Sequence, residues 1–280
     1  MATAQSRCAV GVFSRDETRR AAYAWQHGVL AFAGPIPQLD RYVAYVVAAF
    51  TGDRRVEDDL QSLHSEEHAV LTLNRPRQRN ALSVYLRDAI CDALDDLAED
   101  AAIKAVVITG TGTVFSAGFD LKEFDRAGAD PSFAKELWTS SDRFHRTVLS
   151  FPLPLIAAVN GPAIAGGFDL AVMCDLRVAS STARFSHPER SFGDVVYGPL
   201  HDLVGGAVAR DLTIGGRELN ADQALAVHLV GEVVEPENLM EATSRLLHQV
   251  CVAPRDVLLR IKAKALRRAG IDPSSPTLEL

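Results

Sequence analysis

The sequence has few cysteines, and they do not cluster. Cys8, Cys91, Cys174 and Cys251 lie far apart, and none takes part in a CxxC or Cys/His spacing. This pattern argues against a disulfide framework and against a zinc site, and it favours free thiols in a reducing compartment. We therefore expect a cytoplasmic protein without a bound metal.

The chain also lacks a block of basic residues and a long apolar run. Its net charge is −7, which argues against nucleic acid as the main partner, because duplex binding depends on neutralising phosphates. The most apolar stretch, residues 155–173, is interrupted by Asn160 and Asp169 before it reaches the roughly 20 residues of a membrane span. At the N-terminus arginines are mixed with acids and no continuous apolar segment follows, which argues against a secretory signal.

The most informative stretch is residues 155–175, LIAAVNGPAIAGGFDLAVMCD. An apolar strand over 155–159 ends in a Gly-Pro turn, and a short apolar helix is expected from about residue 167. Gly166 and Gly167 remove side chains where a ligand would approach the backbone. Because the first turn of a helix offers unpaired N–H groups and the positive end of the dipole, we interpret this stretch as an anion site.

Strand-like and helix-like segments alternate from residue 69 onward, as in α/β proteins. Strands are expected over residues 69–74, 103–109, 155–159, 176–179, 183–186 and 231–234, and helices from about residues 83, 131, 167, 200, 221, 237 and 254. Residues 1–64 differ, with one amphipathic helix over about 38–50 and no motif that carries chemistry. We divide the chain into this N-terminal segment, a core of residues 65–235 and a short helical region of residues 236–280.

Two acids and one turn have both a functional and a structural interpretation. Asp169 stands in the first turn of a helix, where the dipole itself favours an acid, and Glu189 beside Arg190 can form a solvated ion pair. The small residues at 116–118 would let a ligand touch the backbone, but an ordinary tight turn has the same composition. On the residues alone the structural interpretation is favoured for the two acids, and both interpretations stay open for the turn.

Several segments in one order resemble the crotonase superfamily, the enoyl-CoA hydratase/isomerase group. They are LTLNRPRQRNALS at 71–83, IKAVVITGTGTVFSAGFDLKEF at 103–124, PLIAAVNGPAIAGGFDLAVMCDLRVAS at 154–180, ARFSHPE at 183–189 and GRELNADQALAVHLVGEVV at 216–234. The resemblance implies an α/β spiral of strand-strand-helix units, usually assembled as a homotrimer or a dimer of trimers. It also implies an acyl-CoA substrate, no cofactor beyond its CoA moiety, and a thioester carbonyl that lies between two backbone N–H groups and becomes an enolate.

The resemblance also places the family's functional positions on this chain. Ala117 and Gly166 match the two oxyanion-hole N–H groups, and Glu189 and Asp169 match the two catalytic acids. The positions that meet the CoA nucleotide match Asn80, Ala81, Leu82 and Lys122. In a hydratase the two acids orient a water molecule and move protons, whereas in an isomerase they relay a proton along the acyl chain.

Four features depart from the common hydratase pattern. Asp169 is one methylene shorter than glutamate and therefore reaches about 1.5 Å less far. The Asp/Glu pair resembles that of dienoyl-CoA isomerases. Those enzymes carry an additional aspartate after the glutamate, and the matching position in this chain is Tyr197. Residues 197–202 stand where the family has a glycine-rich segment, and the C-terminal helices that cover the acyl pocket are shortened. The first 65 residues have no counterpart in the small family members, and we hypothesise that the helix over 38–50 replaces part of that cover.

The sequence therefore predicts an acyl-CoA enzyme that forms an enolate, either an enoyl-CoA hydratase/dehydratase or an enoyl- or dienoyl-CoA isomerase. Glu189 is the principal acid/base in this prediction, and Asp169 is its partner. One alternative is a non-catalytic crotonase homologue that serves as a structural partner subunit. Another is a decarboxylase or thioester hydrolase on the same scaffold, with His187, Tyr197 or His201 as the additional base.

Overall fold

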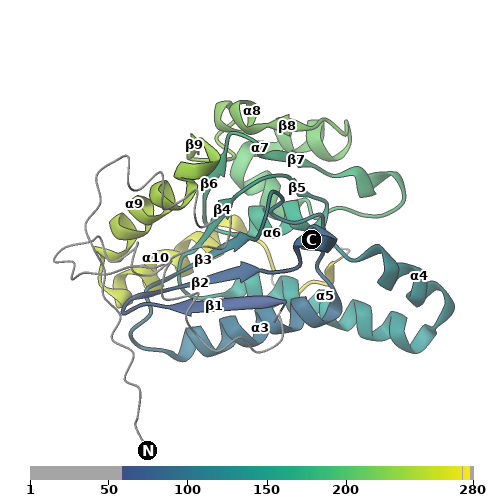
Figure 1. The fold of residues 1–280 in the computed structure, drawn as a ribbon, viewed down its shortest axis with the longest axis horizontal. Helices are drawn as coiled ribbons and strands as arrows, with labels where there is room; N and C mark the ends of the chain where they lie inside the picture. The colour runs from purple at the N-terminus through teal and green to yellow at the C-terminus, as the bar shows by residue number, and fades with distance from the viewer. Residues whose placement is uncertain (1–58, 273, 278–280) are drawn as a thin grey trace, which may run out of the picture. The chain divides into compact units, whose positions relative to one another are not determined.

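The computed structural model of the protein describes residues 59–272 and 274–277 (Figure 1). The amphipathic helix expected over residues 38–50 lies outside these residues, so that helix and its covering role stay predictions. The division of the chain at residues 64 and 235 also stays a prediction.

A six-stranded sheet forms the frame of the described chain (Figure 1). In spatial order its strands are β1 (Leu60–His64), β2 (His68–Leu73), β3 (Ala105–Gly110), β4 (Leu155–Val159), β6 (Leu176–Ser180) and β9 (Glu232–Val234). β1 runs antiparallel to β2, and all the later neighbours are parallel. Since parallel strands end at the same edge of a sheet, the loops that follow β3 and β4 meet there.

Three short strands form a second sheet, in the order β5 (Ala163–Ile164), β7 (Arg184–Ser186) and β8 (Leu219–Asn220). Each of two strands of the large sheet continues into this small sheet and then into a helix. β4 leads through β5 to α6 (Gly166–Met173), and β6 leads through β7 to α7 (Gly198–Thr213). This repeat of strand, strand and helix confirms the predicted fold class.

The remaining helices pack around the two sheets. They are α3 (Val84–Glu99), α4 (Leu121–Ala129), α5 (Pro131–Ser150), α8 (Ala221–Ala226), α9 (Leu239–Cys251) and α10 (Arg255–Ala269), with 3-10 turns η1 (Pro76–Gln78), η2 (Pro188–Ser191) and η3 (Pro236–Asn238). The Ser83 side chain caps α3 by accepting from the Leu86 amide at 3.2 Å, as the sequence predicts. α3 lies against α5, while α4 and the start of α5 project from the sheet (Figure 1).

Three strands of the structure were not expected. β1 has the sequence LQSLH, and its half-buried residues Leu60 and Leu63 are three positions apart, so they do not give the alternation that identifies a strand. β5 and β8 have two residues each, which is too short for a periodic pattern to show. The positions of these strands follow from their partners in the sheets rather than from their own composition.

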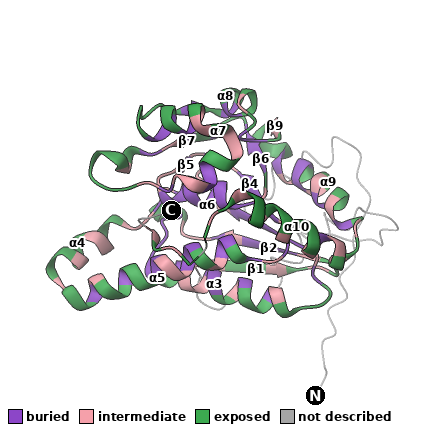
Figure 2. Cartoon of the chain, turned by 180° about the vertical axis from the view of Figure 1, so that it is seen from behind, coloured by how far each residue is buried: buried purple, intermediate pink, exposed green. Residues whose placement is uncertain are grey.

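The centre of the core is β4 and α6. All five residues of β4 and all eight of α6 are buried, and α6 is coloured accordingly in Figure 2. Cys91, Cys174 and Cys251 are buried free thiols, as expected. No helix among the described residues combines the length and the apolarity that a membrane crossing requires.

Glycines around β4 and α6 make room for protein backbone, which corrects the expectation that Gly167 makes room for a ligand. A Cβ at Gly161 would overlap the carbonyl oxygen of Thr113, and a Cβ at Gly167 would overlap that of Ser116. The loop after β3 therefore fits directly against the segment that leads into α6.

We expect Gly161→Ala to lower the free energy of unfolding by about 1–3 kcal/mol, because the methyl group must displace a backbone carbonyl. Gly128→Ala is the matched control. Gly128 lies inside α4 with nothing within 4 Å of an added Cβ, so helix propensity should stabilise this variant by up to about 1 kcal/mol. Urea unfolding of both proteins measures the difference, and equal stabilities would contradict the packing role of Gly161.

Candidate active site

The loop after β3 and the segment before α6 are joined backbone to backbone. The amide of Ile164 donates to the carbonyl of Ser116 at 2.9 Å. Gly118 adopts a φ of 86°, and a Cβ there would lie 2.9 Å from the backbone nitrogen of Gly166. Only glycine at position 118 permits both the conformation and the approach, so the loop lies close to the N-terminal end of α6.

Two backbone N–H groups at this contact have no partner. Among the described residues, neither the Phe119 amide nor the Gly166 amide makes a hydrogen bond, and Gly166 begins a helix, where unpaired donors are normal. The ring of Phe119 lies against Gly166, with Cδ1 2.8 Å from the position of a Cβ on that glycine.

The amide of Ala117, the predicted first oxyanion-hole donor, is already engaged. It donates to the carbonyl of Arg79 at 3.0 Å, so this N–H group is not available to a ligand. The free amide two residues later, that of Phe119, takes its place as the candidate donor. No pattern in the sequence distinguishes the two, because the difference depends on a carbonyl in another loop.

The two predicted acids come together around an imidazole. Asp169 lies in the first turn of α6, Glu189 lies in η2, and His187 immediately precedes η2. Nδ1 of His187 is 2.9 Å from Oε1 of Glu189 and 3.7 Å from Oδ1 of Asp169. Buried atoms without a hydrogen-bond partner among the described residues include Asp169 Oδ1, Glu189 Oε2 and His187 Nε2. Both carboxylates therefore keep an oxygen for a substrate.

The structural interpretations of the two acids do not explain their contacts. Arg190 donates to the carbonyl of Ile214 at 3.1 Å, while Glu189 bonds to His187. Asp169 does stand in the first turn of α6, but its Oδ1 accepts no backbone N–H. A solvated ion pair and a simple helix cap are therefore poor descriptions of these two residues.

Burial raises the pKa of Asp169 to about 7, with the charge of Glu189 acting in the same direction and that of His187 opposing it. For His187, burial lowers the pKa, but the hydrogen bond that it donates to Glu189 and the charge of Asp169 outweigh this effect, so its pKa is raised overall. The cluster therefore holds a proton near neutral pH, as groups that give and take protons during a reaction must.

The same three side chains offer atoms within 4.8 Å of one another that could hold a metal ion. However, Nδ1 of His187, the imidazole nitrogen between the two acids, is engaged by Glu189 at 2.9 Å. We therefore interpret the cluster of Asp169, His187 and Glu189 as a proton-transfer group.

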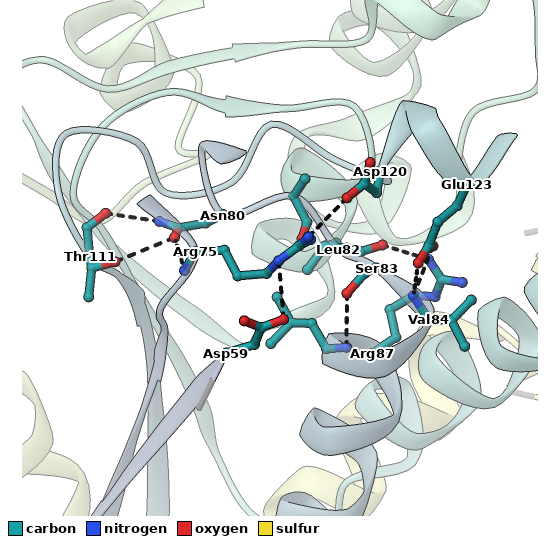
Figure 3. A network of polar contacts seen from close by, with 12 residues as sticks. Asp59, Arg75, Asn80, Leu82, Ser83, Val84, Arg87, Thr111, Asp120 and Glu123 are labelled. Carbon is teal, nitrogen blue, oxygen red and sulfur yellow. Dashed lines mark hydrogen bonds and ion pairs between the residues drawn. The ribbon is translucent and has the colours of Figure 1, made fainter. Parts of the chain in front are cut away.

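Asn80, one of the predicted CoA-binding residues, connects three loops (Figure 3). Its buried side chain accepts from the Arg75 amide at 2.9 Å and donates to the carbonyls of Thr111 at 2.9 Å and Val114 at 2.8 Å. Arg75 in turn pairs with Asp120 at 3.0 Å, just after Phe119. These contacts hold the loop that carries the free Phe119 amide.

The other predicted CoA-binding residues differ in exposure. Ala81 and Leu82 are buried, and their carbonyls accept hydrogen bonds from Arg75 and Arg87. Lys122 is exposed at the start of α4. Contacts of these residues with CoA stay predictions.

Sequence reasoning named His187 only as a base for an alternative reaction and did not connect it with Glu189. No periodic pattern in the sequence joins the two residues, because Glu189 lies in the 3-10 turn η2 and not in an extended segment with His187. A cavity of about 490 Å³ was also not anticipated; it lies at the C-terminal end of α6, beside Lys262, and contains none of the candidate site residues.

A spiral of strand-strand-helix units, with two free amides, one buried acid and one half-buried acid around the first turn of a central helix, defines a protein of the crotonase fold. A family model described as enoyl-CoA hydratase/isomerase matches residues 64–276. The chain belongs to this family, and the predicted membership of the crotonase superfamily is confirmed.

Individual relatives agree. A Thermus thermophilus protein whose name includes enoyl-CoA hydratase is 40% identical over 188 residues, which cover 65% of this chain and 74% of that protein. The crotonyl-CoA hydratase of Syntrophomonas wolfei is 35% identical over 190 residues, which cover 66% and 72%. A solved enoyl-CoA hydratase/isomerase from Xanthobacter autotrophicus Py2 has a TM-score of 0.72 at 28% identity, over 80% of this chain and 84% of that chain.

Asp169→Asn should change how stability depends on pH. The folded protein keeps a proton on Asp169 that the unfolded chain loses near pH 4, so this residue contributes stability at low pH that is lost as the pH rises to about 7. The loss is at most about 1.4 kcal/mol per pH unit. Because asparagine does not ionise, the variant should gain stability relative to the wild type over this interval.

Urea unfolding at pH 5, 6, 7 and 8 measures this trend. The matched control is Asp96→Asn, which changes an exposed residue of α3 and should follow the wild type throughout. Parallel pH profiles for Asp169→Asn and the wild type would contradict the raised pKa.

Proposed function

We propose that this protein is an acyl-CoA enzyme that adds water reversibly to the double bond of a 2-enoyl-CoA thioester through an enolate. The main observation behind the proposal is the cluster of Asp169, His187 and Glu189. Its member Asp169 lies in the first turn of α6, three residues after the free amide of Gly166. The family and the named hydratases among the relatives support the same reaction type.

The thioester oxygen accepts hydrogen bonds from the Phe119 and Gly166 amides in this proposal. These bonds strengthen as the oxygen becomes the oxyanion of the enolate, and the positive end of α6 acts in the same direction. In other enzymes, removal of one such donor raises the barrier by roughly 3 kcal/mol.

Glu189 acts as the base and Asp169 as the acid. Oε2 of Glu189 takes a proton from water as the water oxygen bonds to C3, and the electrons of the C2–C3 double bond move to form the enolate. Asp169, which burial allows to hold a proton up to a pKa of about 7, then gives this proton to C2 as the enolate collapses. The proton on Glu189 returns to Asp169 by way of His187, which lies between the two carboxylates.

A shift of a double bond in an enoyl- or dienoyl-CoA is the second candidate, and the shorter side chain at position 169 favours it. A water held by two carboxylates needs both to reach it, and misplacement by about 1 Å can slow a reaction roughly a hundredfold. In the isomerase reaction Glu189 removes a proton from the acyl chain and Asp169 returns it to another carbon. Assays with crotonyl-CoA, a 3-enoyl-CoA and a dienoyl-CoA separate the two reactions.

A hydrolase or decarboxylase is not favoured by the positions of its candidate bases. His201 is exposed on α7, and its ring contact is with Tyr197, 5.5 Å between centroids. His187 is committed to Glu189.

We further propose a homotrimer or a dimer of trimers that works in the cytoplasm without a cofactor beyond CoA. Exposed apolar residues near the site support an assembly, since Phe192 is 74% and Ile214 is 73% exposed in the isolated chain.

Glu189→Gln should reduce turnover of crotonyl-CoA at least about a hundredfold, because general base catalysis is lost. Folding should change little, since glutamine can still bond to His187. The loss of enoyl-thioester absorbance measures turnover, and Glu218→Gln, which changes an exposed partner of Arg184, is the matched control. Activity retained in Glu189→Gln would remove this residue from the mechanism.

A further inference from the structure

Arg87 is a buried cation that the mechanism proposed for this site does not use. Arg87 on α3 is completely buried, and its guanidinium carbon lies 4.3 Å from the centroid of the Phe119 ring. This is the geometry of a cation–π contact. Phe119 is also the residue whose amide is a candidate oxyanion donor.

Hydrogen bonds hold the guanidinium in place from three directions. Arg87 donates to the carbonyl of Leu82 at 2.6 Å, to the carbonyl of Leu137 at 3.2 Å and to Oγ of Ser140 at 3.3 Å. The amide of Leu82 donates to the carbonyl of Gly118, just before Phe119, at 2.8 Å. Arg87 therefore connects α3 and α5 with the loop that carries the free amide, and Figure 3 shows its bond to Leu82.

The charge of Arg87 has no direct counterion. No carboxylate among the described residues forms an ion pair with it; Glu123 accepts from the Val84 amide at 2.9 Å, and Asp88 accepts from Ser140 at 2.9 Å. Burial lowers the pKa of Arg87 to about 10, so it stays charged at neutral pH. A buried, incompletely balanced cation is unfavourable unless negative charge arrives near it.

The proposed reaction supplies negative charge close to the Phe119 ring. Ring atoms Cδ1 and Cε1 lie 2.8 and 3.0 Å from the Cβ position of Gly166, so the same ring contacts the guanidinium and adjoins the residue of the second candidate donor. An enolate oxygen held by these two amides would therefore form close to the cation, in an interior where charges interact strongly.

We propose that Arg87 is a positioning residue of the oxyanion hole: it holds the Phe119 amide in place through the ring and the Leu82 carbonyl, and its charge stabilises the enolate. This inference rests on the proposed function. A merely structural Arg87 would affect folding without affecting the thioester carbonyl, and this difference makes the two roles separable.

The test uses the full chain with the Glu189→Gln change, which should bind crotonyl-CoA and convert it at least about a hundredfold more slowly than the wild type. Infrared difference spectra of crotonyl-CoA with a 13C-labelled thioester carbonyl report how strongly that carbonyl is polarised. We expect a shift to lower frequency in this parent, a clearly smaller shift with Arg87→Met and an intermediate shift with Arg87→Lys. With Glu189 intact, Arg87→Met should lower kcat by about ten- to a hundredfold with KM changed much less.

Arg177→Met is the matched control. Arg177 is also buried and donates to backbone carbonyls, among them those of Ala171 at 3.3 Å and Asp175 at 3.2 Å, but at the C-terminal end of α6. The Arg177→Met protein should lose stability and keep the full carbonyl shift.

If Arg87→Met does not fold, Arg87→Gln removes the charge and keeps an N–H donor, and Arg87→Gln should also reduce the carbonyl shift.

An unchanged carbonyl shift in the Arg87 variants would overturn the inference while leaving the proposed function intact. A parent that binds crotonyl-CoA without any carbonyl shift would instead overturn the oxyanion hole itself, and with it both proposals.

Discussion

The contact between the loop after β3 and the N-terminal turn of α6 is the constraint on which the site depends. Two amides can serve one oxygen only if their backbones come within a few ångströms, and a side chain at Gly118 would meet the nitrogen of Gly166 at 2.9 Å. Gly161 and Gly167 maintain the same close approach to Thr113 and Ser116. The small residues of these segments are thus explained by backbone packing, and the binding of an anion is a consequence of that packing.

Burial of charge is the second constraint, and it acts on both sides of this contact. Asp169, His187 and Glu189 place charged or ionisable atoms within 4.8 Å of one another in a largely buried cluster, so the protonation state of each depends on the other two. The guanidinium of Arg87 contacts the ring of Phe119, and its hydrogen-bond partners are all neutral groups. A region that is unfavourable for fixed charge in the free protein is well suited to charge that appears only in a transition state, because water does not screen it.

The alternation of strands and helices in the core could be predicted, because β4, α6 and their neighbours have clear periodic or apolar patterns. The short strands β5 and β8 could not, since two residues carry no period. For the site, motif resemblance located Gly166, Asp169 and Glu189, whose geometry is compatible with the proposed roles. It selected Ala117, whose amide bonds to Arg79. Long-range contacts decide which amide is free, and one sequence does not contain them explicitly.

The role of Asp169 is decided by the relative size of two effects. A helix N-terminus stabilises an ionised acid by roughly 0.3–1 kcal/mol and so lowers its pKa by less than one unit. Burial is the largest cause acting in the opposite direction; with the opposing charge of His187 and the added effect of Glu189, the pKa is raised overall from 3.8 to about 7, which corresponds to roughly 4 kcal/mol. Burial is the larger effect, so the carboxyl is not held there as an anion that caps α6. Its position favours the protonated form, and a buried acid with a proton near neutral pH is suited to protonating a carbon atom.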